Sequence, residues 1–145
     1  MLTFDSNILI YAIDTLYPGR QTAALDLLAA AGRRSAFITQ QAIGEFCKVA
    51  RGKRMPAYRL REQVEEWTRL FAIVPTSLDQ LLAAAALADL RQKQYWDMVI
   101  VRVAADAGAT VLFTEDIGDG EVIAGVRIVN PFSDTNSAAV AALLA

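Results

Sequence analysis

The sequence has 145 residues, the length of one domain, and a hydrophobic content of 54%, which suits a sheet covered by helices on both faces. It contains no histidine and one cysteine, Cys47. These counts exclude His-ligated metals, Ser-His-Asp hydrolysis, imidazole acid–base catalysis, internal disulfides and multi-cysteine zinc sites. The formal net charge of −2 excludes a general attraction to nucleic acid, but it is compatible with a local basic patch. No apolar run approaches the roughly 20 residues of a membrane span. The N-terminus is typical of a strand, not of a secretion signal, so we expect a cytoplasmic protein with no membrane contact.

The first half of the chain alternates between short apolar runs and longer helical segments. Residues 2–4 are the first expected strand, followed by a short helix over 7–13. Pro18 and Gly19 predict a turn, and Thr39 is a plausible helix N-cap. The pattern predicts further helices over 20–31, 40–51 and 56–71, with strands over 36–38 and 72–74.

The second half continues the alternation. Ser77 should cap a helix over 78–93, Asp97 should open another that ends at Gly108, and strands are expected over 110–113 and 126–129. Strands that alternate with helices predict an α/β domain with a largely parallel sheet. We expect this domain to span residues 1–132. Residues 133–145 should form an apolar C-terminal tail, whose composition is compatible with a short helix.

Four aspartates lie where apolar strands give way to helices or loops. Asp5 follows the first strand, Asp97 begins a helix, and Asp116 and Asp119 lie in a loop beyond the strand at 110–113. In an open parallel sheet, binding sites form at the carboxyl ends of the strands, near the point where the strand order reverses. Carboxylates gathered there would repel one another, so the pattern predicts a divalent cation.

Glu45 is a candidate fifth carboxylate because of its position on its helix. The apolar stripe of that helix is defined by residues 42, 43, 46, 49 and 50. At ~100° per residue, Glu45 points roughly 80–100° away from the centre of the stripe. It can therefore reach a cleft while its helix stays packed.

Each acid also has a structural interpretation when taken alone. Asp5 and Asp97 are suitable helix caps, Asp116 and Asp119 suit turns, and Glu45 suits a solvated helix face. Independent caps need not share one sheet edge, however, and a capping aspartate can also bind a metal.

The ordered set of acidic motifs resembles the PIN-domain nucleases, and among them the VapC toxins of bacterial toxin–antitoxin pairs. The resemblance extends over residues 2–132 and is carried by Phe4-Asp5-Ser6-Asn7, Glu45, Tyr95-Trp96-Asp97-Met98 and Thr114-Glu115-Asp116-Ile117-Gly118-Asp119. Gly120 departs from the pattern, because many relatives carry Phe there, and so does the apolar tail. The resemblance implies a PIN-like three-layer fold with a central, mostly parallel sheet and helices on both faces.

The resemblance also implies an activity and partners. It suggests the toxin component of a toxin–antitoxin pair, acting as an endoribonuclease on RNA that is often structured, such as tRNA. A small cognate antitoxin would cover the cleft. The protein would be a homodimer, for which the Ala/Leu-rich helix of residues 78–88 is a candidate surface.

Carboxylate oxygens suit hard Mg²⁺ or Mn²⁺ ions. We expect Asp5, Asp97 and Asp116 to bind one or two such ions, and Asp119 and Glu45 each to be a further ligand or to hold metal-bound water. Glu45 should join Asp5, Asp97 and Asp116 in catalysis. The supporting side chains, which equally suit turns or caps, are Ser6, Asn7 and Thr114.

Positive charge is concentrated near Glu45 in sequence. Arg51, Lys53 and Arg54, followed by Arg59 and Arg61, form a candidate RNA-binding rim, although a solvated helix connection explains them equally well. Trp96 suits base stacking, but an aromatic before an inward-facing helix is more typical of a core.

Two other functions match parts of this sequence. A doubly wound phosphatase would use Asp5 as its nucleophile, but such families usually carry a second Asp at the position of Asn7. A PIN-like RNA-binding module without activity is the second alternative, against which the complete acidic set argues.

Overall fold

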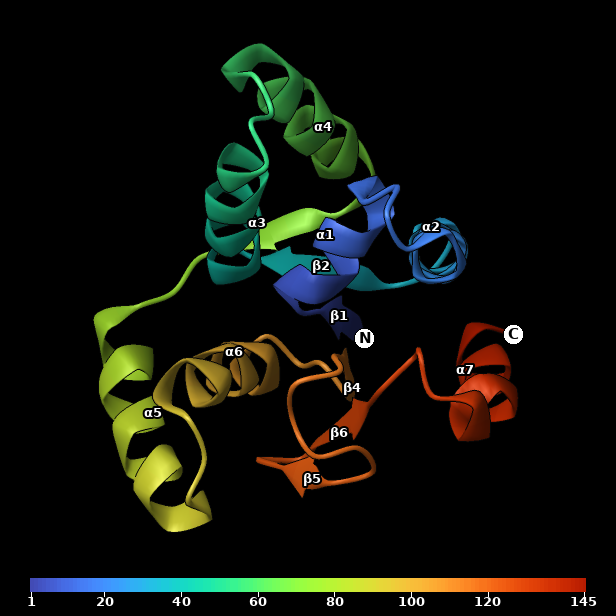
Figure 1. The fold of residues 1–145 in the computed structure, drawn as a ribbon. Helices are drawn as coiled ribbons and strands as arrows, with labels where there is room; N and C mark the ends of the chain where they lie inside the picture. The colour runs from blue at the N-terminus through green and yellow to red at the C-terminus, as the bar shows by residue number, and fades with distance from the viewer.

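The computed structural model describes all residues from Met1 to Ala145. Its centre is a six-stranded sheet in the order β3-β2-β1-β4-β6-β5, in which only the β5–β6 pair is antiparallel (Figure 1). The expected α/β architecture with a mostly parallel sheet is therefore confirmed. The strands are β1 (Leu2–Phe4), β2 (Ala36–Thr39), β3 (Ala72–Val74), β4 (Val111–Phe113), β5 (Val122–Ile123) and β6 (Val126–Val129).

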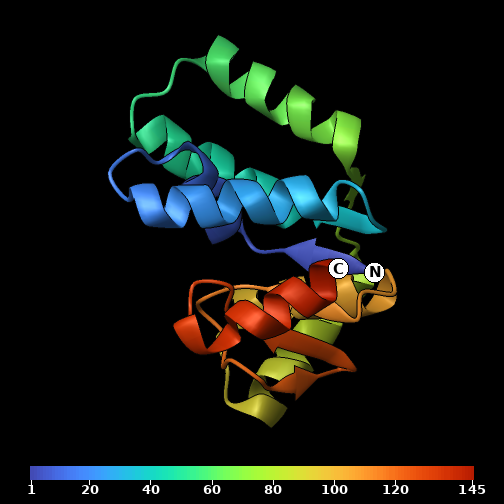
Figure 2. The same cartoon turned by 90° about the vertical axis from the view of Figure 1, so that its right-hand side faces the viewer.

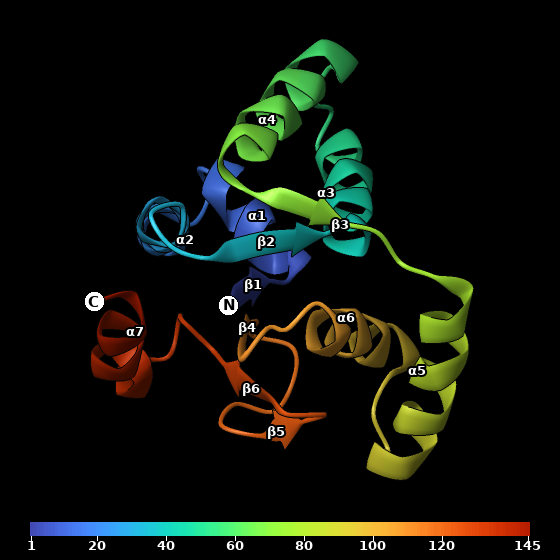
Figure 3. The ribbon, with the colours of Figure 1, turned by 180° about the vertical axis from the view of Figure 1, so that it is seen from behind.

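Helices fill the connections between the strands. They are α1 (Ser6–Ile13), α2 (Pro18–Ala31), α3 (Gln40–Gly52), α4 (Ala57–Leu70), α5 (Leu78–Arg91), α6 (Tyr95–Asp106) and α7 (Ser137–Leu144). The first four are grouped together, and α5 and α6 lie apart from them (Figures 1 and 3). From β1 the chain adds β2 and β3 on one side of the sheet, and it then returns to place β4 on the other side of β1. Because each of these crossovers is right-handed, α5 and α6 lie on the opposite face of the sheet from α1–α4. None of the helices combines the length and the apolar composition that a bilayer crossing requires.

The differences from the sequence-based expectations have local causes. Pro18 is the first residue of α2 instead of a turn residue, because the first turn of a helix needs no N–H donor there. The strand β5 was not predicted: it pairs with β6 across a tight turn in which Ala124 and Gly125 both have positive φ. Asp97 is the third residue of α6 and Gln94 is its N-cap, so Asp97 does not open the helix.

The core fixes the relative position of β1 and β4. Phe4 and Phe113 are register partners in these strands, and their rings stack with centroids 6.0 Å apart. Phe71 meets Phe4 edge-on at 5.5 Å. The backbone N–H of Asp5 then donates to the Phe113 carbonyl at 2.9 Å. The residues that follow the two strands are therefore held side by side at the same sheet edge.

The last residues form a 3₁₀ turn (Asp134–Asn136) and α7. The helix α7 lies between α2 and the β5–β6 hairpin (Figure 2). Arg34 Nε donates to the Leu144 carbonyl at 3.0 Å, and Leu143 packs against the core. The tail therefore docks on the domain as a short helix.

Candidate active site

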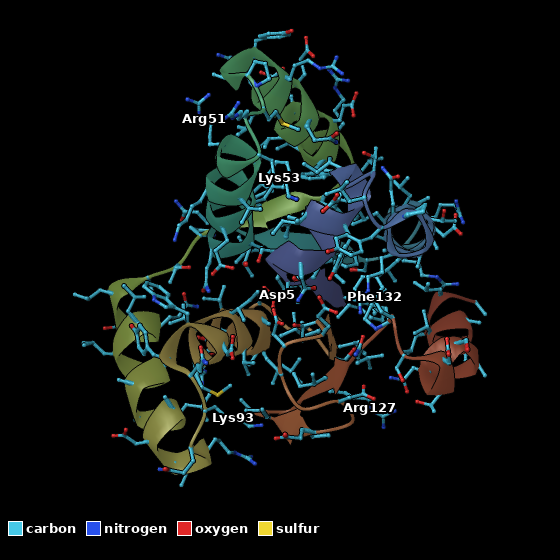
Figure 4. The ribbon with its side chains drawn as sticks, in the orientation of Figure 1. Asp5, Arg51, Lys53, Lys93, Arg127 and Phe132 are labelled. Atoms are coloured by element: carbon cyan, nitrogen blue, oxygen red, sulfur yellow. The ribbon has the colours of Figure 1, made fainter.

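The strand order reverses between β1 and β4, where Asp5 directly follows β1 and Asp116 lies in the loop that follows β4. From β1 the chain proceeds to β2 and β3 on one side, while β4 and β6 lie on the other. In open α/β sheets, ligands bind in the crevice beyond the carboxyl ends of the strands at such a point. Figure 4 shows Asp5 there, in the middle of the molecule between the α1–α3 group and α6.

Asp5 is the most buried of these acids. It is the N-cap of α1 and only 5% exposed, and it accepts hydrogen bonds from the Ser6 N–H at 2.7 Å and from Thr114 Oγ1 at 2.8 Å. Loss of hydration raises the pKa of Asp5 to about 6, against the lowering effect of these two hydrogen bonds. Glu45 and Asp116 raise this pKa further by repulsion. A capping role and proximity to other carboxylates therefore coexist.

Thr114 joins the segment after β4 to the start of α1. Its fully buried hydroxyl donates to Asp5 and accepts from Asn7 Nδ2 at 3.2 Å and from the Asp116 N–H at 3.1 Å. Asn7 Nδ2 also donates to Asp116 Oδ2 at 3.0 Å. These bonds hold Asp5 and Asp116 beside each other across a sequence separation of more than one hundred residues.

Glu45 is held by side chains from two helices. Ser6 Oγ donates to Glu45 Oε2 at 2.7 Å, and Gln41 Nε2 donates to Glu45 Oε1 at 2.8 Å. Gln41 Nε2 also donates to the Trp96 carbonyl at 3.0 Å, so α1, α3 and the first turn of α6 are linked. Sequence analysis placed Glu45 at the edge of a cleft but did not identify Gln41.

Asp97 belongs to the same electrostatic group. Partial burial is the main cause of its raised pKa, and repulsion from Asp116 and Glu45 adds to it. Lys93 acts in the opposite direction, but its ammonium is engaged at 2.6 Å by Glu121. The charges of Glu45 and Asp116 therefore raise the pKa of both Asp5 and Asp97.

Asp119 has different partners. Its Oδ1 accepts from the Asn130 N–H at 2.8 Å, and Asn136 Nδ2 donates to both of its oxygens at 2.8 Å. Asp119 therefore anchors the segment that leads into α7. Its role as a metal ligand stays a prediction that these contacts do not support.

The loop after β4 is also fixed from its other side. Tyr11 Oη donates to Glu115 Oε1 at 2.7 Å, and Arg20 pairs with the same carboxylate. The Arg20 guanidinium lies 5.1 Å from the centre of the Phe132 ring. Glu115, next to Asp116, is therefore neutralised by a cation, and sequence analysis did not single out this contact.

The donor chemistry of the group fits a hard divalent cation. The ion pairs of the chain all involve other acids, so no Lys or Arg forms an ion pair with Asp5, Glu45, Asp97 or Asp116. Asn7 Oδ1 is a buried acceptor without a hydrogen-bond donor, and Asn7 is bonded to the same group. Carboxylate and amide oxygens are suitable ligands for Mg²⁺ and Mn²⁺. In the present side-chain arrangement, no three His, Cys, Asp or Glu residues are placed to hold one metal ion.

A cleft of about 620 Å³ opens beside Glu45. Lys48 is exposed in its wall, and Trp96 is 59% exposed, in contrast to the core position that the sequence favoured. Trp96 stays outside because it precedes the buried stripe of α6, which begins at Met98. Lys48 lies one helical turn after Glu45, a spacing visible in the sequence. The cleft is lined by Ser6, Gln41, Gly44, Glu45, Lys48, Val49 and Trp96.

The three predicted rim residues lie at the other end of α3. Lys53, eight residues after Glu45, is roughly 12 Å further along the helix and pairs with Asp14 at 2.9 Å. Arg51 is exposed, and Figure 4 shows it directed away from Asp5. Lys53 and Arg54 line a separate cleft of about 520 Å³. These cations are therefore distant from the carboxylates, and one of them is already neutralised.

Comparison with protein families agrees with this geometry. Residues 2–118 match the PIN domain family. The chain belongs to the PIN domain family. Its members are generally metal-dependent nucleases, so the resemblance seen in the sequence is confirmed at the level of the family. The match includes Asp5, Glu45, Asp97 and Asp116, and ends just before Asp119. No match was found among curated proteins.

The raised pKa of Asp5 predicts an unusual pH dependence of stability. The folded-state pKa of about 6 exceeds the ordinary value of 3.8, so the folded protein binds the Asp5 proton more tightly than the unfolded chain. The stabilisation of the folded state by this tighter proton binding is complete below about pH 4 and is lost as the pH rises through 6. The free energy of unfolding falls by up to roughly 3 kcal/mol over this interval. In EDTA, Asp5→Asn should therefore gain free energy of unfolding relative to wild type over this interval, as measured by urea denaturation. A difference that does not vary with pH would contradict the raised pKa.

The Thr114 hydroxyl should control both stability and the titration of Asp5. Thr114→Val removes a buried donor to Asp5, which should cost about 1–3 kcal/mol and move the pH dependence to higher pH. Thr3→Val is the matched control, because the buried Thr3 hydroxyl donates only to the Phe37 carbonyl, at 2.9 Å. Both variants should unfold at lower urea concentration, and only Thr114→Val should shift the pH midpoint. The same midpoint in both variants would show that Thr114 does not act on Asp5.

Proposed function

We propose that this protein is an endoribonuclease that hydrolyses RNA phosphodiester bonds with Mg²⁺ or Mn²⁺, and that it is the toxin component of a toxin–antitoxin pair. One observation carries the proposal: beside the switch point of the sheet, Glu45 and Asp116 raise the pKa of both Asp5 and Asp97 by repulsion, and no Lys or Arg forms an ion pair with any of these four acids. The family supports nuclease chemistry in general. The restriction to RNA and the toxin role rest on the resemblance of the sequence motifs.

Asp5, Asp97 and Asp116 are the residues that would hold the ion. A divalent ion at such a site lowers the pKa of bound water and neutralises charge on phosphoryl oxygens. The protein's own contribution is to keep the carboxylates in place. The hydroxyl of Thr114 fixes Asp5, and Asn7 fixes Asp116.

Glu45 would be the additional catalytic carboxylate. Each of its oxygens accepts one hydrogen bond, from Ser6 and from Gln41, and it lines the open cleft. It is therefore both oriented and accessible to water or substrate. No imidazole is present in the chain, so proton transfer during hydrolysis would depend on carboxylates such as this one.

The raised pKa values of Asp5 and Asp97 link the proposed function to pH. A protonated carboxyl is a poor metal ligand, so protons and metal ions compete for the same oxygens. Because the pKa of Asp5 is about 6, metal affinity and cleavage should both increase as the pH rises through that value, and the raised pKa of Asp97 acts in the same direction.

The proposed substrate is a polyanion, which requires positive charge near an acidic site. Lys48 supplies it within the cleft. Arg51, Lys53 and Arg54 would bind only more distant phosphates, because they lie two helical turns beyond Glu45.

The partners also belong to this proposal. A small antitoxin would cover the cleft, and two copies of the chain would form a dimer. The exposed side chains of Leu78 and Leu82, one helical turn apart on α5, support a dimer surface, since neighbouring exposed apolar residues on a helix mark contact sites.

Cleavage should require both the metal and Asp97. With Mn²⁺, wild type should cleave RNA, EDTA should abolish cleavage, and Asp97→Asn should reduce the rate by about 100-fold or more, because a proposed ligand is lost. Asp26→Asn, which removes an exposed acid on α2, is the control and should behave as wild type. The measurement is the appearance of new RNA ends in vitro and after pulsed expression in cells. Cleavage that persists in EDTA would contradict the proposal, and RNA binding without cleavage would favour the inactive RNA-binding alternative.

A further inference from the structure

The cleft beside Glu45 is large enough for one nucleotide unit and is partly aromatic. Its volume of about 620 Å³ falls within the range of small-molecule sites. Residues of α1, α3 and α6 line it. The space beside Gly44 in the wall of this cleft is open, since no atom lies within 4 Å of the position that a Cβ would occupy there.

Trp96 presents an unusual amount of aromatic surface to water. It is 59% exposed, whereas the other tryptophan of the chain, Trp67, is 5% exposed and packs on Phe46. Large aromatic side chains are normally well buried, so an exposed indole in a cleft marks a binding surface.

The Trp96 ring is nevertheless held in position. Tyr95 meets it edge-on, with ring centroids 5.2 Å apart, and the Tyr95 hydroxyl donates to the Leu81 carbonyl at 2.9 Å. Gln41 fixes the Trp96 backbone by its hydrogen bond to the carbonyl. A preorganised ring loses little conformational freedom when a flat ligand stacks on it.

Lys48 adds a free positive charge to the same cleft. The chain has three lysines, and the other two are paired, Lys53 with Asp14 and Lys93 with Glu121. Lys48 is in no ion pair although Glu45 lies one turn away on the same helix. Its ammonium is therefore available to a phosphate.

We infer that this cleft is a nucleotide subsite, in which Trp96 stacks on one base of a single-stranded segment of the substrate and Lys48 binds an adjacent phosphate. The inference rests on the proposed function for the nature of the substrate. Stacking on an aromatic side chain tolerates any base, because every base has a π-face. The subsite would thus select unpaired nucleotides without selecting a sequence.

The position of the subsite suits cleavage next to the stacked base. Trp96 directly precedes Asp97, and Gln41 bonds both the Trp96 carbonyl and Glu45. A base stacked on Trp96 would therefore bring its own backbone towards the carboxylates. Trp96 is in this sense a substrate-positioning residue, so its loss should raise KM more than it lowers kcat.

The test uses the fluorescence of Trp96 in the absence of metal. In a Trp67→Phe background, Trp96 is the only tryptophan. EDTA removes divalent ions, so that RNA binding is measured without metal-dependent cleavage. A short single-stranded oligoribonucleotide should quench the emission, and an abasic oligomer with the same number of phosphates should not. Binding of labelled RNA, followed by anisotropy, should weaken roughly tenfold or more in Trp96→Ala and much less in Trp96→Phe, which keeps a ring.

The contribution of Lys48 is tested by salt dependence. Lys48→Met should reduce the slope of log affinity against log salt by about one. Arg33→Met is the matched control, because Arg33 is exposed, forms no ion pair and lies before β2, at the opposite sheet edge. Its slope should equal that of wild type.

The outcomes separate this inference from the proposed function. Equal quenching by the abasic oligomer, no quenching at saturating RNA, or unchanged RNA affinity in Trp96→Ala would overturn the subsite, and the exposed ring would then suit a protein partner. Base-dependent quenching in EDTA would support the subsite even if no metal restored cleavage. In that case the nuclease proposal alone would fail.

Discussion

Repulsion among four carboxylates is the constraint on which the rest of this structure depends. Asp5 is almost completely buried, and Glu45 and Asp116 add their charges around it. Without a cation, such an arrangement costs free energy, since the Asp5 carboxylate is poorly hydrated and the charges near it have the same sign. The chain tolerates it because the hydrophobic core and the pairing of β1 with β4 determine where Asp5 and Thr114 must lie.

The hydrogen bonds around the acids hold them without neutralising them. Hydroxyl and amide groups of Ser6, Asn7, Gln41 and Thr114 donate to the carboxylates, whereas Arg20 and Lys93 are engaged by Glu115 and Glu121 at the periphery. Neutral donors fix geometry and leave the net charge of the group unchanged. A site built in this way suits a divalent ion supplied from solution, which is the chemistry typical of the PIN domain family.

The parts of the site that could be predicted from sequence are those set by regular structure. Strand ends place Asp5 and Asp116 at one sheet edge, and the helical period of α3 places Glu45 at a boundary. The remaining features depend on contacts that have no local pattern. The exposure of Trp96, the contact of Asp119 with Asn136 and the pairing of Lys53 with Asp14 arise from the way separate elements pack. The strand β5 is only two residues long, too short for an alternating pattern to indicate it.

The most direct test of the account is the thermal unfolding of wild type and Asp5→Asn at neutral pH, each in EDTA and in Mn²⁺. If the carboxylates form a cation site, Mn²⁺ should raise the melting temperature of wild type by several degrees at saturation, since a ligand that binds only the folded state stabilises it. The rise should be much smaller in Asp5→Asn. A melting temperature of wild type that does not respond to Mn²⁺ or Mg²⁺ would contradict the account.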